Sequence, residues 1–174
     1  MVTRSGHPSD SLRSLRAGRL PAVILFFVLF SGAIPSLAAA QSSIQFNGGA
    51  SIDPEQAYVG VAWESPNLGG RFRLRPGLDG GFGDGLRLGT FNFDLVVLIP
   101  LGTTGWSLIQ GGGPTIVVAK FSDAPELGSE LHAGGSYLFG FRHKDGFFTE
   151  FRIAGGGSYV PSLKIGAGWS IQIK

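Results

Sequence analysis

The segment 163–173 alternates strictly between apolar side chains and side chains that are polar or very small. The apolar positions are Leu163, Ile165, Ala167, Trp169, Ile171 and Ile173, and between them lie Lys164, Gly166, Gly168, Ser170 and Gln172. A period of two predicts a β-strand with one apolar face, because successive side chains of a strand point to opposite sides. Either protein or lipid must cover such a face.

Residues 1–40 are expected to lie outside the fold. Four arginines precede an uninterrupted apolar run at 22–30, and small residues at 38–40 follow it. This is the layout of a secretory signal peptide, and an apolar run of this length is too short to span a bilayer as a helix. We expect cleavage between Ala40 and Gln41. Export by the general secretory route is expected, because the leader has neither an Arg-Arg pair nor a cysteine.

The net positive charge of the whole chain comes from this leader. The whole chain has 14 basic and 12 acidic residues, and the leader contains four Arg and one Asp. The remainder therefore has 10 basic and 11 acidic residues, a formal charge of −1. A domain of that charge lacks the basic surface of a nucleic-acid-binding protein. The chain has no cysteine, which excludes disulfides and thiolate metal sites.

The remaining residues predict one all-β domain. They hold 26 of the 29 glycines, which disfavours helices. Eight strands are expected, at 43–52, 56–64, 70–82, 85–101, 105–119, 129–142, 147–155 and 163–173. Short Gly-, Pro- and Asp-rich links join them, and such links connect antiparallel neighbours. We therefore expect an eight-stranded up-and-down barrel. In 105–119, Trp106, Leu108 and Gln110 share one face, so a glycine bulge or a misplaced boundary is expected there.

The two faces of these strands favour lipid outside the barrel. The larger face is apolar and aromatic, whereas the smaller face holds glycine and charges of both signs, which suit a narrow lumen. A closed barrel is the only sheet that a bilayer tolerates. Aromatic residues near strand ends form the expected interfacial girdle: Trp63, Phe72, Trp106, Phe141, Phe147 and Trp169. The alternative is a soluble periplasmic barrel whose large residues face inward around a small apolar ligand.

Alternation places Arg71, Arg73 and Arg75 on one face, where buried guanidiniums would need acidic partners. The expected lumen charge network comprises Glu64, Arg71, Arg73, Arg75, Asp94, Glu150, Arg152 and Lys164. It would act either as a salt-bridge plug or as an anion-selective constriction in a narrow-pore channel. With periplasmic termini, the links after the second, fourth and sixth strands face the periplasm. The outward links are expected to carry Asp53, Glu55, Asp79, Asp84, Asp123 and Glu126.

Three stretches carry a resemblance to a known family. They are Gly105-Trp106-Ser107-Leu108 followed by Gly111-Gly112-Gly113-Pro114, the run from Lys144 to Phe151, and Ser162-Leu163-Lys164-Ile165. Over 43–174 the chain resembles the small outer-membrane β-barrel proteins of Gram-negative bacteria, the OmpA-like or porin-family barrel domain. The resemblance implies residence in the outer membrane, contact with its lipid, and insertion by the barrel-assembly machinery. One departure is that the chain ends Ile173-Lys174, where the family usually ends in an aromatic residue.

Chemistry-bearing residues are sparse. The trio His132, Ser136 and Glu150 is the one catalytic candidate, but four residues along a strand separate its histidine and serine by about 13 Å. No metal-ligand spacing or cofactor motif appears. We therefore expect a monomeric, non-enzymatic barrel with a structural role in the envelope, with no cofactor and no nucleic-acid partner.

Overall fold

The computed structural model describes residues 41–69, 71–83, 85–121 and 128–173, so the expected leader lies outside the described residues. The strands are β1 (Ser42–Ile52), β2 (Gln56–Glu64), β3 (Phe72–Gly83), β4 (Leu86–Pro100), β5 (Trp106–Phe121), β6 (Ser129–His143), β7 (Phe147–Gly156) and β8 (Leu163–Ile173). Every boundary lies within two residues of its predicted position. Among these residues no helix is long and apolar enough to cross a membrane.

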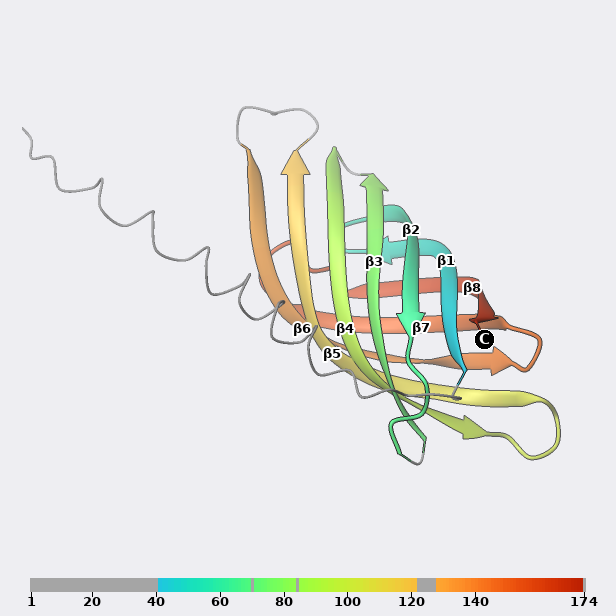
Figure 1. Cartoon of the computed structure of the whole chain (residues 1–174). Helices are drawn as coiled ribbons and strands as arrows, with labels where there is room; N and C mark the ends of the chain where they lie inside the picture. Colours follow the sequence, from blue (N-terminus) through green and yellow to red (C-terminus); the bar gives the residue numbers. More distant parts are fainter. Residues whose placement is uncertain (1–40, 70, 84, 122–127, 174) are drawn as a thin grey trace, which may run out of the picture. The chain divides into compact units, whose positions relative to one another are not determined.

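The strands form one closed antiparallel barrel in the order β1 to β8, which confirms the predicted fold (Figure 1). Each strand pairs with its neighbours in sequence, and β1 also pairs with β8. That closing ladder runs without a break from Ser42 opposite Ile173 to Ile52 opposite Leu163. The alternating segment 163–173 is therefore the strand that closes the barrel.

The barrel has two ends that we name by what they carry. The terminal end holds Ser42, Ile173 and the links 65–71, 101–105 and 144–146. The loop end holds the links 53–55, 84–85, 122–128 and 157–162. This division follows from strand parity, because antiparallel neighbours reverse direction at each link.

The predicted glycine bulge in β5 is wrong, whereas the boundaries of β5 do differ from the predicted 105–119, by one residue at the start and two at the end. The register of β5 with β4 is the same from Leu86 opposite Phe121 to Pro100 opposite Ser107. Its register with β6 is also continuous over the whole strand. The sequence pattern of β5 is irregular for another reason: its lumen-facing side includes the fully buried Ile109, Val117 and Ala119. Apolar residues thus occupy both faces of an undistorted strand.

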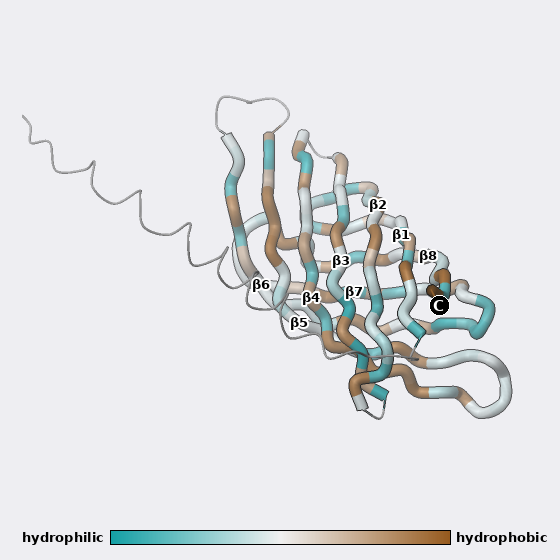
Figure 2. Tube along the Cα trace, in the orientation of Figure 1, coloured by the Kyte–Doolittle hydropathy of each residue, from teal (hydrophilic) through white to brown (hydrophobic). Residues whose placement is uncertain are grey.

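Side-chain direction divides the barrel into an apolar exterior and a mixed interior. The hydropathy of the trace alternates along the strands (Figure 2). Trp169 is 50% exposed, and Phe139 stacks on Phe151 across β6 and β7 with ring centroids 5.0 Å apart. The exposed large residues of the strands include Phe46, Val59, Val61, Trp63, Phe72, Leu78, Phe82, Leu95, Ile116, Val118, Leu131, Tyr137, Phe141, Phe147, Ile153, Ile165, Trp169 and Ile171. A soluble barrel with large residues inside requires the opposite arrangement.

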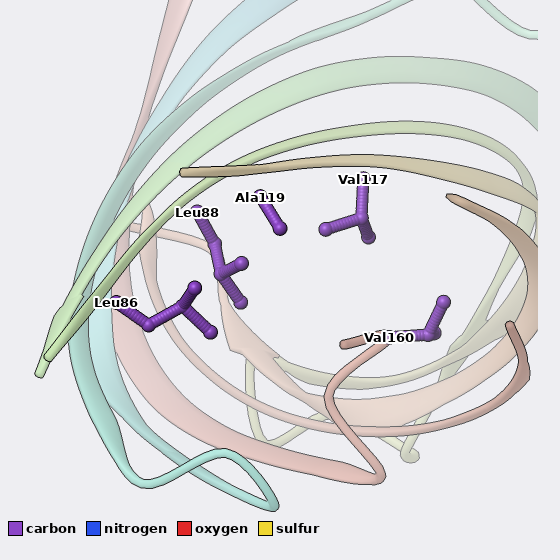
Figure 3. Packing of buried hydrophobic residues seen from close by; sticks show 5 residues of the cluster. All are labelled: Leu86, Leu88, Val117, Ala119 and Val160. Carbon is purple, nitrogen blue, oxygen red and sulfur yellow. The ribbon is translucent and has the colours of Figure 1, made fainter. Parts of the chain in front are cut away.

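Two apolar clusters lie inside the lumen, which the sequence did not indicate. The inner cluster, toward the terminal end, comprises Val96, Leu98, Ile109, Leu138 and Phe148. The outer cluster, toward the loop end, comprises Leu86, Leu88, Val117, Ala119 and Val160 (Figure 3). Apart from the partly buried Leu98, the residues of both clusters are almost completely buried, so they exclude water from these stretches of the lumen.

Val160 reaches the outer cluster because the link 157–162 folds back against the barrel. The amide of Gly157 donates to the carbonyl of Ala133 at 3.0 Å, and the amide of Ser162 donates to the carbonyl of Asp53 at 3.2 Å. Tyr159 adopts a left-handed φ of 64°, a strained conformation for a non-glycine residue. The strained turn directs Val160 into the ring of strands, where it is 7% exposed.

Close approach of neighbouring strands predicts which glycines are irreplaceable. A Cβ at Gly140 would overlap the carbonyl oxygen of Thr149, whereas one at Gly135 on the same strand meets nothing within 4 Å. Gly140→Ala should lower the free energy of unfolding by about 1–3 kcal/mol, and Gly135→Ala should change it by less than about 0.5 kcal/mol. Denaturant titration of the purified barrel measures both. Equal effects would show that strand approach does not select these glycines.

Candidate functional site: the charged lumen

Ion pairs fill the middle of the barrel. Five cations and four carboxylates take part, namely Arg73, Arg75, Arg142, Arg152 and Lys164 with Glu64, Asp79, Asp94 and Glu150. We call this set the lumen network. Its residues come from six of the eight strands. Their side chains face inward because every second residue of a strand points toward the barrel axis.

Glu64 is the centre of the network at the terminal end. It is fully buried, and the two Nη atoms of Arg142 donate to its two oxygens at 2.8 Å each. Arg73 Nη1 donates to Oε1 at 2.8 Å, and Gln45 Nε2 donates to Oε2 at 2.7 Å. Four hydrogen bonds therefore satisfy a carboxylate that would otherwise be costly to bury.

Two guanidiniums and two carboxylates alternate in the middle of the lumen. Arg152 binds Asp94 in the bidentate mode, with distances of 2.9 Å from Nη1 to Oδ1 and 2.7 Å from Nη2 to Oδ2. Its Nη2 also donates to Glu150 Oε1 at 3.2 Å. Arg75 Nη2 donates to Glu150 Oε2 at 2.6 Å and lies 3.8 Å from Asp94 Oδ2. Because each charge contacts an opposite one on two sides, the group forms a closed electrostatic ring.

The third part of the network lies nearest the loop end. Lys164 Nζ donates to Asp79 Oδ2 at 2.7 Å and lies 4.3 Å from the centre of the Tyr58 ring. Asn92 Nδ2 also donates to Asp79 Oδ2 at 3.0 Å. The placement of Asp79 in an outward link is therefore wrong: it belongs to β3, at an even spacing from Arg75, so both side chains face the lumen.

The structure brings together seven of the eight residues expected in the lumen and leaves one out. Arg71 is exposed and precedes β3, which begins at Phe72 rather than at residue 70. It therefore belongs to the turn and not to the lumen face. Sequence reasoning missed Arg142 and Asp79 as members, although alternation alone places Arg142 opposite Phe141 and hence inward.

Little open space remains around the network. Two voids beside the central ring measure about 20 Å³ each, close to the room that one water needs. Larger hollows of about 400 Å³ and 450 Å³ lie at the terminal end and the loop end. The described lumen is thus wide at its mouths and narrow at the ion pairs.

The catalytic trio is not assembled. His132 Nε2 lies 3.2 Å from Glu130 Oε2, and Ser136 Oγ accepts from Arg152 Nη1 at 2.7 Å. Glu150 is held by Arg75 and Arg152, so it does not orient the histidine. In the part of the chain that the structure describes, no group of three or more His, Asp or Glu side chains could hold a metal ion.

The six residues of the predicted aromatic girdle all lie toward the terminal end. Phe147 contacts Trp106 and Trp169, with ring centroids 6.4 Å and 6.3 Å apart. Trp63 and Phe72 flank the link between β2 and β3 and are 41% and 50% exposed. These six aromatic residues therefore lie toward one rim of the barrel.

Neither a protein-family model nor a curated protein matches this chain. A solved structure does: the N-terminal β-barrel domain of Pseudomonas aeruginosa OprF, with a TM-score of 0.56 at 10% identity, over 77% of this chain and 98% of that chain. The chain has the fold of this eight-stranded barrel domain. Ail, the attachment invasion locus protein of Yersinia pestis, aligns over 76% of this chain and 99% of its own at 12% identity with a TM-score of 0.47. At such identities the likeness to the OprF domain shows the fold alone.

Removing one partner from the central ring should destabilise the barrel strongly. Arg152→Met leaves two buried carboxylates with one guanidinium, which should lower the free energy of unfolding by about 3–5 kcal/mol. Arg87→Met removes an exposed arginine on β4 and should change it by less than about 0.5 kcal/mol. Denaturant titration compares the two. A small effect of Arg152→Met would mean that the ring adds little to stability.

Proposed function

We propose that this protein is an integral, non-enzymatic barrel of the Gram-negative outer membrane, with a structural role in the envelope and a lumen closed by its own side chains. The observation that carries the proposal is the division between an apolar exterior and an ion-paired interior. The OprF likeness adds a precedent for this fold in an outer-membrane protein.

The exterior is too apolar to face water. Twenty-two large hydrophobic side chains are exposed among the described residues, most of them on the outward faces of strands. Burying each such side chain is worth about 1.5–3 kcal/mol, so their joint exposure in water would favour aggregation strongly. Lipid tails cover this surface at no such cost. The soluble ligand-binding alternative has no comparable support, because it needs these residues inside.

The height of the apolar band matches a bilayer. On β4 the outward positions from Gly89 to Ile99 carry no charge. Ten residue steps at about 3.3 Å, tilted by about 40°, span about 25 Å along the barrel axis. This is the thickness of the apolar band in transmembrane barrels.

The proposed orientation places the terminal end in the periplasm. The aromatic girdle would then lie at the inner interface. The expected leader at 1–40 fits export to this compartment. Insertion would use the barrel-assembly machinery. Every described strand is paired on both sides, so the barrel has no free strand edge with which a second copy could pair. We therefore propose a monomer.

The ion pairs in the middle of the barrel favour a closed lumen over a narrow pore. The voids beside the central ring measure only about 20 Å³ each, whereas the hollows at the two ends are much larger. An ion would have to displace the ion pairs of the ring in order to pass.

Fractionation tests the location. Expressed with its leader in a Gram-negative host, the protein should sediment with outer membranes and resist extraction by urea. Unboiled samples should migrate differently from boiled ones on a denaturing gel, because a closed barrel survives the detergent. Release of the protein in the osmotic-shock fluid would refute the membrane assignment.

Planar-bilayer recording tests the closure. The wild-type barrel should show no discrete current steps. Replacing the four members of the central ring together, Arg75, Asp94, Glu150 and Arg152, by alanine removes the blockage without leaving an unpaired charge. That variant should conduct if it keeps the heat-dependent gel shift. Current steps in the wild type equal to those of the variant would support the channel alternative.

A further inference from the structure

Two basic residues lie side by side on the outer surface of the barrel at its loop end. Arg87 on β4 is the direct cross-strand partner of Lys120 on β5, and both are exposed. Direct partners on one face have Cβ atoms about 4.5–5.5 Å apart. Like charges so placed repel each other, so the pair is unfavourable unless an anion lies between them.

Among the described residues, the cross-strand neighbours of this pair do not supply that anion. Phe82 lies opposite Arg87 on β3, and Ser129 lies opposite Lys120 on β6. Among the ion pairs of the described residues, none involves either basic side chain. The row across four strands therefore presents two positive charges flanked by an aromatic ring and a hydroxyl.

The pair lies at the edge of the apolar band. Two residues further along the same faces are Gly89 on β4 and Val118 on β5, which is 43% exposed, and Ile116 follows at 40%. With the membrane placement that we propose, Arg87 and Lys120 lie where the acyl region ends and the polar headgroups begin. Cations at that depth are well placed for lipid phosphates.

Two outward-facing glycines lie next to the pair. Gly80 on β3 is the partner of Gly89. A Cβ added at Gly89 meets nothing within 4 Å, and one at Gly80 meets only the Phe82 ring at 3.6 Å. Packing does not require glycine at either position, unlike at Gly140. The two glycines leave a strip without side chains next to the basic pair, against which an acyl chain can lie.

We propose that Arg87 and Lys120 bind a phosphate group of a phosphorylated glycolipid in the outer leaflet, with one of its acyl chains against Gly80 and Gly89. This inference rests on the proposed membrane location. The charge of the phosphate offsets the repulsion within the pair, and each basic side chain donates a charge-assisted hydrogen bond to it.

Native mass spectrometry of the full-length barrel in uncharged detergent tests the proposal. The probes are hexa-acylated, doubly phosphorylated lipid A, the same lipid with its phosphates removed, and inorganic phosphate. Arg87→Gln with Lys120→Gln is compared with Arg71→Gln with Lys144→Gln, which removes the same charge from exposed positions at the terminal end. All variants must first show the heat-dependent gel shift and insertion into vesicles.

Phosphorylated lipid A should bind the wild type and the terminal-end variant alike, and should bind the Arg87/Lys120 variant about tenfold more weakly. The phosphate-free lipid should not distinguish the variants. Gly89→Phe should weaken binding of the phosphorylated lipid several-fold, while Gly135→Phe on β6, away from the basic pair, should not.

Three results would overturn the proposal. One is an equal loss in both double variants, which would indicate unspecific charge attraction. Another is binding of the phosphate-free lipid to the wild type as tightly as the phosphorylated lipid. The third is saturation of the pair by inorganic phosphate alone, which would make it a site for free phosphate. A wild type that fails to insert into vesicles would instead refute the membrane location itself.

Discussion

The pairing of β1 with β8 is the constraint on which the rest of this structure depends. It joins the first strand to the last over their whole length and leaves no unpaired edge among the described strands. Once the sheet is closed, each strand has a side toward the axis and a side away from it, and the period of two assigns every residue to one of them. A sheet with open edges could not place its backbone in lipid, because unpaired amides and carbonyls are too costly there.

The interior follows from the narrowness of an eight-stranded barrel. Charged side chains from opposite walls are close enough to meet, so Arg142 on β6 reaches Glu64 on β2 and Arg152 on β7 reaches Asp94 on β4. Burial of such groups is favourable only when hydrogen bonds satisfy them, and the four bonds to Glu64 show how fully this is done. The two apolar clusters limit water in the lumen, which strengthens the electrostatic interactions of the network.

The sequence was sufficient to predict the strands and their faces but not which residues meet across the lumen. Alternation around Phe91 and Phe93 placed Asp94 inside correctly, because parity needs only local information. The contacts of Asp94 with Arg152 and of Asp79 with Lys164 depend on the stagger between strands, which no local pattern records. Arg71 was misplaced because the start of β3 lies two residues later than predicted. The inward turn at Val160 depends on the left-handed conformation of Tyr159. The sequence does not indicate that conformation, because the residue is not a glycine.

The central claim is that the outward face of the barrel contacts lipid. The three tryptophans, Trp63, Trp106 and Trp169, all lie on that face toward the terminal end, so the native protein carries its own depth probes. The most direct measurement is tryptophan fluorescence of the barrel in vesicles whose lipids carry bromine either near the headgroup or near the bilayer centre. Our account predicts quenching by both, stronger with bromine near the headgroup, because a girdle residue lies at the interface. Fluorescence unaffected by either lipid would contradict it.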